Sequence, residues 1–347
     1  MNQTSLRDRL LLSTLPPEER ENGRRLVAAL SLIERKLKEV EREMEERIHS
    51  SVPTVALIGD YVAEGGGKRI RPALLLLGAR LLGYEGSRDV RYGAMIEFIH
   101  SATLVHDDII DAAETRRGRP SVNRRWGNEL TVLFGDYLYM KAMEIALDEG
   151  DLKVLKLLSD VTLAMTEGEI LGSERRGSID IGLPVYLDIV RRKTALLFAA
   201  ACKIPALLLP AGAPYADTLW GFGEALGTAF QLQDDLLDYT ASEEELGKPV
   251  LSDLREGKLT LPLILALPSM SRSERGLVEV VMREQRFESV TADQLLEIVH
   301  RTGAMASARR MLEEWASRAA DHAGRLPAGD SRDALLLAAE YAANRRK

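Results

Sequence analysis

Apolar residues recur at three- and four-residue steps along most of the chain, which is the period of an amphipathic α-helix. A helix over residues 18–48 is predicted by the first clear run, Leu26, Leu30, Ile33, Leu37 and Val40. Similar runs predict helices at residues 53–64, 72–82, 89–113, 129–149, 151–174, 184–202, 216–239, 261–267, 273–284, 292–301, 304–323 and 331–344. Few segments alternate as strands do, and there is no internal repeat. The pattern predicts an all-α fold with many helices.

Composition fits a folded helical protein and narrows its class. A length of 347 residues is typical of about two domains. No low-complexity linker divides the chain, however, so we expect one all-α domain over residues 1–347. The polar residues 1–17 are expected to be poorly ordered. A net charge of −7 argues against a dedicated nucleic-acid binder.

The cysteine content and the apolar runs indicate which cellular compartment to expect for the protein. One cysteine, Cys202, excludes an intrachain disulfide framework and a cysteine zinc site, and it fits a reduced cytoplasmic compartment. The N-terminus lacks the apolar core of a signal peptide, and the most apolar runs are too short to span a bilayer. We therefore expect a soluble protein with no stable membrane anchor.

Two acidic motifs of the form DDxxD, at residues 107–111 and 234–238, lie inside otherwise apolar helical runs. In each motif the first and last aspartates share one helix face, one turn apart. Like charges at that spacing cost a helix roughly 0.2–0.5 kcal/mol, and burial raises the cost unless a cation compensates. One such motif is as well explained by a solvated acidic patch, but two favour a functional role.

The residue types indicate which cation would bind. Carboxylates without clustered histidine or cysteine suit a hard cation, and Mg²⁺ is commonly held between one or two carboxylates and substrate phosphates. A glycine-to-helix junction at residues 66–72 carries Lys68, Arg69 and Arg71, and helix N-termini attract anions. Arg116 and Arg117 offer further phosphate donors, although a solvated charged loop explains them equally well in isolation. Together these residues predict a metal-assisted polyphosphate site.

Six ordered motifs give the chain a strong resemblance to the trans-isoprenyl diphosphate synthases, also called the polyprenyl synthetase family. They are GGKRIRP at 66–72, EFIHSATLVHDDIID at 97–111, ETRRGRP at 114–120, RRKTALLF at 191–198, GTAFQLQDDLLDY at 227–239 and LREGKLTLPLI at 254–264. The resemblance implies a single large helical bundle around a central cavity, the isoprenoid synthase fold. It also implies a Mg²⁺-dependent condensation of an allylic diphosphate, farnesyl or geranylgeranyl, with isopentenyl diphosphate.

The resemblance assigns roles to residues that match the motifs. About three Mg²⁺ ions are implied to bind with the diphosphate, at Asp107, Asp111 and Asp234 directly and with support from Asp108, Asp235 and Asp238. Contacts to the allylic diphosphate are implied for Arg116, Lys193, Lys248 and Lys258. The isopentenyl diphosphate pocket is implied for Lys68, Arg71, His100 and Arg117. Thr194 and Gln231 are implied beside the reacting carbons. The expected catalytic set is Asp107, Asp111, Lys193, Thr194, Gln231, Asp234 and Lys248.

Product length follows from the helix that carries the first motif. In the family, residues one to two turns before the first DDxxD form the wall beneath the growing chain, and here they are Ile99, Ala102 and Thr103. Ala102 leaves this space open, whereas a bulky aromatic would close it. The run HSATLVHDD resembles long-chain members, which implies a hexa- to decaprenyl diphosphate, with octaprenyl expected, for quinone side chains. Family members are typically homodimers, and we expect the same here.

Three alternatives remain at this point. A short-chain farnesyl or geranylgeranyl diphosphate synthase would share the motifs. A terpene cyclase would need neither the isopentenyl pocket nor a second complete DDxxD. A non-catalytic subunit of a heteromeric synthase usually loses its acidic motifs, and all six aspartates are present here. One departure from the family pattern is Leu251, which stands where glycine is common and leads us to expect a different loop geometry.

Overall fold

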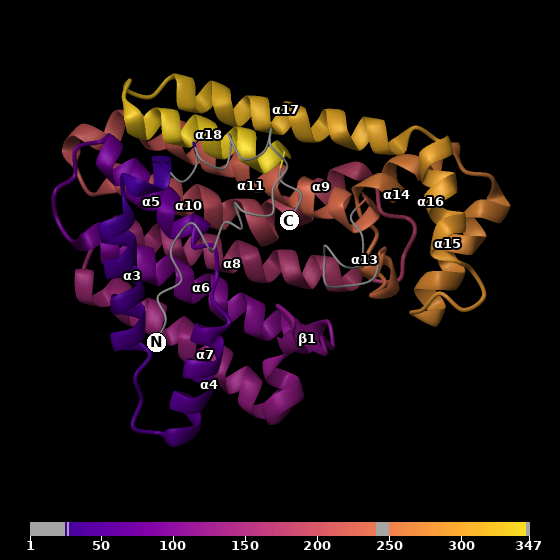
Figure 1. Cartoon of the computed structure of the whole chain (residues 1–347), viewed down its shortest axis with the longest axis horizontal. Helices are drawn as coiled ribbons and strands as arrows, with labels where there is room; N and C mark the ends of the chain where they lie inside the picture. The colour runs from indigo at the N-terminus through magenta and orange to yellow at the C-terminus, as the bar shows by residue number, and fades with distance from the viewer. Residues whose placement is uncertain (1–24, 26–27, 241–249, 345–347) are drawn as a thin grey trace. The chain divides into compact units, whose positions relative to one another are not determined.

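The computed structural model describes residues 25, 28–240 and 250–344, and helices dominate this part of the chain (Figure 1). The elements are α3 (Glu34–Arg47), α4 (Pro53–Glu64), α5 (Ile70–Leu81), α6 (Arg88–Ile110), β1 (Thr115–Arg116), β2 (Arg119–Pro120), α7 (Val122–Glu149), α8 (Leu152–Glu174), α9 (Leu183–Val190), η2 (Arg191–Ala195), α10 (Leu196–Leu207), η3 (Pro210–Tyr215), α11 (Ala216–Thr240), α13 (Ser252–Arg255), α14 (Leu261–Ala266), η4 (Leu267–Ser269), α15 (Arg272–Glu284), α16 (Ala292–Arg301), α17 (Ala304–Gly324) and α18 (Asp330–Asn344). The expected all-α fold is confirmed.

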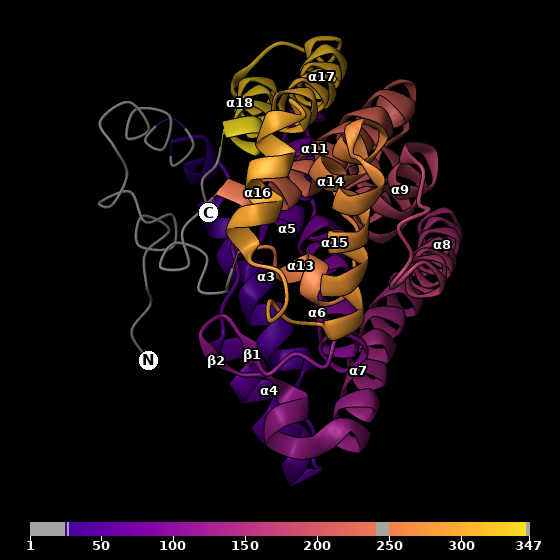
Figure 2. The ribbon, with the colours of Figure 1, turned by 90° about the vertical axis from the view of Figure 1, so that its right-hand side faces the viewer.

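Contacts divide the chain into two compact units, and the first comprises Met1–Ser159, Ala199–Gly221 and His322–Ala338. In unit 1, α6 packs along α7 and against α3 and α5 (Figure 2). Every residue of α5 from 72 to 79 is buried, because this stretch is apolar on all sides. Tyr61 of α4 donates a hydrogen bond to the Pro120 carbonyl at 2.7 Å, which ties the β1–β2 hairpin to α4.

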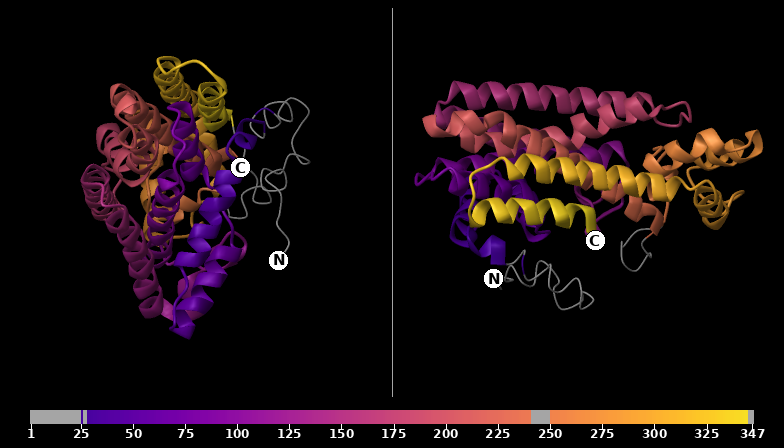
Figure 3. Two further views of the ribbon diagram at one scale, coloured as in Figure 1. Left: turned by 90° about the vertical axis from the view of Figure 1, so that its left-hand side faces the viewer. Right: turned by 90° about the horizontal axis from the view of Figure 1, so that it is seen from above.

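Unit 2 comprises Asp160–Phe198, Phe222–Asp321 and Ala339–Lys347. A Cβ added to Gly227 of α11 would lie 2.7 Å from the Cα of Ala195, so the backbones of α11 and η2 approach closely. Arg309 of α17 donates to the Ala343 carbonyl in the last turn of α18 at 3.0 Å. Figure 3 shows α17 and α18 as the yellow ribbons. The expectation of one domain over residues 1–347 stays a prediction, and residues 1–17 lie outside the described chain.

The clearest differences from the sequence pattern lie in three of the predicted helices. The start predicted at residue 129 is wrong, because α7 begins at Val122 and bends at Gly127, where φ is 82°. The continuous helix predicted over residues 184–202 is interrupted by the π-helical turn η2, and its wider turn is invisible to apolar spacing. Within the helix predicted over residues 18–48, the described part contains a turn at residues 32–33, and α3 follows it.

Among the described helices, none combines the length and apolarity needed to cross a membrane. Cys202 is a buried free thiol, and burial raises its pKa above the ordinary value. Such a thiol is unreactive and packs as a small apolar residue.

Candidate active site

The first acidic motif lies at the C-terminal end of α6. Asp107 and Asp108 occupy the last turn of the helix, and Asp111 caps it by donating its N–H to the Asp107 carbonyl at 2.8 Å. Asp107 and Asp111 are half-buried, whereas Asp108 is buried. The C-terminal end of a helix already carries partial negative charge, so carboxylates there are unfavourable without a cation. This placement favours a cation beside Asp107 and Asp111.

Asp108 contacts an arginine of the β1–β2 hairpin. Arg116 donates from Nε to Oδ1 of Asp108 at 2.8 Å, and its Nη2 reaches the same oxygen. Burial raises the pKa of Asp108, and Arg116 partly opposes this effect. The Asn123 amide donates to the Asp108 backbone carbonyl at 3.1 Å. Asp108 therefore anchors Arg116 against the end of α6.

A cluster of arginines lies near enough to His100 in unit 1 to lower its pKa. The pKa of His100 lies well below its ordinary value because of burial and four guanidinium groups, those of Arg71, Arg117, Arg69 and Arg116. The pKa of Arg117 is also lowered, first by burial and then by Arg69. Arg69 and Arg71 are half-buried, whereas Arg116 and Arg117 are exposed. Like charges gathered in this way repel one another unless an anion lies among them. The cluster thus has the chemistry of a diphosphate site, and the lowered pKa of His100 favours a neutral imidazole near it.

The glycine-to-helix junction shapes this arginine cluster. Arg69 has a left-handed backbone, with φ 50°, and its Nη1 donates to Glu97 at 2.8 Å. A Cβ on Gly67 would lie 3.0 Å from Nη1 of Arg69 and 3.4 Å from Nη1 of Arg117. Glycine at this position therefore leaves room for both guanidinium groups. Lys68 is exposed beside them.

The second acidic motif lies on α11 in unit 2. Asp234 is half-buried, whereas Asp238 is buried and accepts hydrogen bonds from the hydroxyl and N–H of Ser252, at 2.7 and 3.1 Å, and from the N–H of Asp253. Asp238 therefore holds the start of α13. The residue before α13 is Leu251, whose φ of 54° is the conformation a glycine would adopt. Burial of the Leu251 side chain and a hydrogen bond from its N–H to the Asp238 carbonyl hold this backbone conformation. The expectation of a different loop geometry stays a prediction, since residues 241–249 lie outside the described chain.

Asp235 is the centre of a buried hydrogen-bond network. Tyr186 donates to one carboxylate oxygen, and Nε2 of Gln231 donates to the other at 3.0 Å. Thr194 in turn donates to Oε1 of Gln231 at 2.9 Å. Burial raises the pKa of Asp235 to about 7, and Asp253 adds to the rise. Unit 2 therefore brings together three of the predicted residues, Thr194, Gln231 and Asp235.

The predicted diphosphate-binding lysines have acidic neighbours in unit 2. Lys193, on the π-helical turn η2, forms an ion pair with Glu169 of α8. Lys258 forms an ion pair with Glu256 at 2.8 Å. Lys248 lies outside the described residues. Both described lysines are half-buried, so each has solvent-accessible surface.

The acidic residues suit Mg²⁺ only if the ligand supplies oxygens as well. Among the described residues, no group of three histidine, cysteine or acidic side chains is gathered closely enough to hold a metal ion. Mg²⁺ characteristically keeps waters and substrate phosphates and uses one or two carboxylates. The half-buried pair Asp107 and Asp111, one turn apart, fits that pattern.

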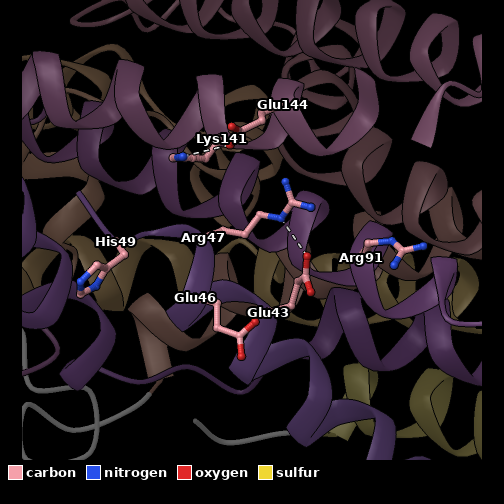
Figure 4. Close-up of a pocket in the computed structure, with 7 residues that line it drawn as sticks. All are labelled: Glu43, Glu46, Arg47, His49, Arg91, Lys141 and Glu144. Atoms are coloured by element: carbon pink, nitrogen blue, oxygen red, sulfur yellow. Dashed lines mark hydrogen bonds and ion pairs between the residues drawn. The ribbon is translucent and has the colours of Figure 1, made fainter. Parts of the chain in front are cut away.

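The predicted chain-length residues line up along α6. Ile99 and Ala102 are buried, and Thr103 is half-buried with its hydroxyl donating to the His100 carbonyl at 2.8 Å. Elsewhere in unit 1, a pocket of about 410 Å³ is lined by charged residues, Glu43, Glu46, Arg47, His49, Arg91, Lys141 and Glu144 (Figure 4). None of its residues was predicted for the site, and its lining includes two ion pairs within single helices, Arg47–Glu43 and Lys141–Glu144 (Figure 4).

The sequence profile of the polyprenyl synthetase family matches residues 52–299. The chain belongs to the polyprenyl synthetase family. It is therefore a prenyltransferase. This polyprenyl synthetase is 39% identical over 300 residues to the octaprenyl diphosphate synthase of Escherichia coli (strain K12), covering 86% of this chain and 93% of that relative.

Two further relatives agree in length and fold. The polyprenyl synthetase is 32% identical over 326 residues to heptaprenyl diphosphate synthase component 2 of Bacillus subtilis (strain 168), covering 94% of this chain and 92% of that one. The crystal structure of a polyprenyl synthase from Caulobacter crescentus CB15, complexed with calcium and isoprenyl diphosphate, superposes with a TM-score of 0.86 at 33% identity. That match covers 93% of this chain and 98% of the other.

Two residues that contact the predicted site residues of unit 2 were not predicted from the sequence. Tyr186 of this polyprenyl synthetase touches Asp235, and Glu169 pairs with Lys193. Tyr186 precedes Thr194 by eight residues, about two helical turns, so a polar residue on the same face was the available clue. Glu169 lies on a different helix, and its contact depends on tertiary packing.

Proposed function

We propose that this prenyltransferase joins an allylic diphosphate, farnesyl or geranylgeranyl, head-to-tail to isopentenyl diphosphate and repeats the step. The expected product is a hexa- to decaprenyl diphosphate, with octaprenyl favoured, as a precursor of quinone side chains. The observation that carries the proposal is the arginine cluster, in which Arg69 and Arg117 both approach Gly67, in the same unit as His100 and the half-buried Asp107 and Asp111. The similarity to an octaprenyl diphosphate synthase supports the long product.

Each group of residues has its own task in this reaction. Asp107, Asp111 and Asp234 are the residues proposed to hold Mg²⁺. Magnesium bound with the substrate supplies positive charge that neutralises the departing diphosphate. Arg116, held by Asp108, donates to the allylic diphosphate oxygens, as do Lys193, Lys248 and Lys258. Because Asp108 is already paired with Arg116, we propose that it positions this arginine and leaves the metal to the half-buried aspartates.

The arginine cluster and the unit 2 network act on the second substrate and the reacting carbons. Arg71 and Arg117, with Lys68 and His100, bind the diphosphate of isopentenyl diphosphate. Its double bond attacks C1 of the allylic substrate as the allylic diphosphate departs, and loss of a proton restores a double bond in the product. The side-chain oxygens of Thr194 and Gln231 stabilise the allylic cation during this step.

We propose that the enzyme is a homodimer and that α7 contributes to its interface. Leu133, Met140 and Leu147 are 58%, 60% and 63% exposed and recur every seven residues, so they form one apolar stripe. A second copy is the simplest partner for such a stripe. The heptaprenyl relative is named as one component of a synthase, so a heteromeric partner is the competing outcome. Light scattering of the purified chain alone separates the two, since a monomer contradicts the homodimer.

Incubation of the purified chain with Mg²⁺, farnesyl diphosphate and labelled isopentenyl diphosphate tests the function. We expect labelled polyprenyl products of hexa- to decaprenyl length by thin-layer or mass analysis, and none after chelation of the metal. A product no longer than geranylgeranyl diphosphate would favour a short-chain synthase. No elongation by a folded sample would overturn the proposal. Restoration of activity by a second protein would then identify a non-catalytic subunit.

A further inference from the structure

Tyr186 begins a chain of hydrogen bonds that ends at Thr194. The side chain of Tyr186 is buried, and its hydroxyl donates to Oδ2 of Asp235. Oδ1 of the same carboxylate accepts from Nε2 of Gln231 at 3.0 Å, and Oε1 of Gln231 accepts from Thr194 at 2.9 Å. The Leu261 N–H also donates to Asp235, at 3.4 Å. All of these residues belong to unit 2.

The hydrogen bonds of this network run in one direction, because the side chains differ in which hydrogen bonds they can donate. Three donors converge on the Asp235 carboxyl group: the Tyr186 hydroxyl and the Leu261 N–H reach Oδ2, and Nε2 of Gln231 reaches Oδ1. Gln231 must therefore turn its NH₂ group toward Asp235 and its oxygen toward Thr194. The single hydroxyl proton of Thr194 is then committed to Gln231. The lone pairs of the Thr194 oxygen consequently point away from Gln231.

Close packing of the backbones of α11 and η2 keeps the hydrogen-bonded side chains within reach of one another. Gly227 lies one turn before Gln231 on α11, and a Cβ there would come within 2.7 Å of the Ala195 Cα and 3.0 Å of the Phe198 Cβ. Thr194 directly precedes Ala195 on the π-helical turn η2. Because α11 and η2 touch at backbone level, the Thr194 hydroxyl is brought within hydrogen-bond distance of Gln231. π-Helical turns of this kind are frequent at functional sites.

We infer that Tyr186 is a positioning residue for chain elongation. It holds Asp235, Asp235 orients the Gln231 amide, and the amide directs the lone pairs of Thr194 toward the reacting carbons. The inference rests on the proposed function, in which the oxygens of Thr194 and Gln231 stabilise the allylic cation. Tyr186 itself touches neither diphosphate in this scheme. Its loss is therefore expected to lower kcat with little change in either KM.

The test compares Tyr186→Phe with Tyr239→Phe in the full chain. Tyr239 is also buried in unit 2, but its hydroxyl pairs with Thr260 at 2.9 Å and lies outside this chain of hydrogen bonds. With farnesyl diphosphate, isopentenyl diphosphate and Mg²⁺, we expect Tyr186→Phe to lower kcat about fivefold, the effect of one hydrogen bond, and Tyr239→Phe to change it less than twofold. KM is expected to stay within about twofold for both substrates.

A double-mutant cycle distinguishes positioning from packing. In a Thr194→Val background there is no hydroxyl to orient, so adding Tyr186→Phe is expected to leave kcat unchanged. Asp235→Asn, which no longer dictates the amide direction, is expected to lose kcat like Tyr186→Phe, and it serves as a second variant if the tyrosine variant fails to fold. The inference would be overturned if folded Tyr186→Phe or Asp235→Asn kept the wild-type kcat. It would also be overturned if Tyr186→Phe lowered kcat as much in the Thr194→Val background as in the wild type. An inactive wild-type chain would instead defeat the proposed function.

Discussion

Leu251 occupies a backbone conformation that leucine rarely adopts, and this permits a sharp test of the loop before α13. Its φ and ψ are 54° and 35°, its side chain is 1% exposed, and its N–H donates to the Asp238 carbonyl at 2.9 Å. The perturbation is a pair of variants, Leu251→Ala and Leu251→Gly. Both remove the buried side chain, but only glycine relieves the left-handed backbone.

The two variants differ in a predictable direction. Removal of a buried leucine costs about 2–5 kcal/mol, and this loss is common to both. A left-handed backbone costs a non-glycine residue about 1–2 kcal/mol, which glycine recovers. Glycine in turn loses about 0.4–1 kcal/mol through the greater freedom of the unfolded chain. We therefore expect Leu251→Gly to be more stable than Leu251→Ala by about 0.5–1 kcal/mol, and both to be less stable than wild type.

Urea unfolding at matched m-values measures this difference as a shift in midpoint. Leu254 supplies the control, because it is equally buried but lies inside helix α13. At Leu254 we expect the alanine variant to be more stable than the glycine variant by about 1 kcal/mol, the ordinary helix preference. If the alanine variant is also as stable as or more stable than the glycine variant at Leu251, the left-handed conformation does not carry the strain assigned to it.

Substitution of Asp107 by Asn is expected to lower elongation by about 100-fold or more, with partial recovery at high Mg²⁺, because a developing diphosphate charge loses compensation; an unchanged rate of label incorporation would contradict this. Ala102→Phe is expected to shorten the product by filling space along α6, and an unchanged product ladder by mass analysis would count against the chain-length assignment. The lowered pKa of His100 means that the unfolded chain binds a proton that the native state does not. Stability is therefore expected to fall as pH drops below about 6.5, less so in His100→Gln, and parallel pH curves for the two proteins would refute this.

The helices and the acidic motifs were predictable because each leaves a local pattern. Apolar spacing of three and four residues marks an amphipathic helix, and carboxylates inside such a run are conspicuous because they oppose burial. The bend at Gly127 and the π-helical turn at residues 191–195 were not predictable in this way. An extra residue in a turn leaves the local composition unchanged and is fixed only by what the helix packs against.

The contacts that each side chain makes were harder to predict than which residues belong to the site. The resemblance placed Arg116 near a diphosphate, but its pairing with Asp108 depends on the two-residue hairpin that returns it to α6. Arg69 was recognised as a cation of the glycine-to-helix junction, yet its partner Glu97 comes from another helix. Such contacts join residues that are distant in sequence, so periodicity carries no information about them.

The six motif aspartates are equivalent in sequence but occupy two kinds of environment. Asp107, Asp111 and Asp234 are half-buried, whereas Asp108, Asp235 and Asp238 are only 1–2% exposed. Each of the three buried carboxylates accepts at least two hydrogen bonds from the protein. A buried carboxylate that already accepts several hydrogen bonds has few lone pairs left for a metal, and removal of its charge leaves its donors unsatisfied. In the proposed function, the repeated DDxxD pattern therefore combines two tasks that need the same side chain. The half-buried members would offer negative charge to a cation, and the buried members hold Arg116, the Gln231 amide and the loop before α13.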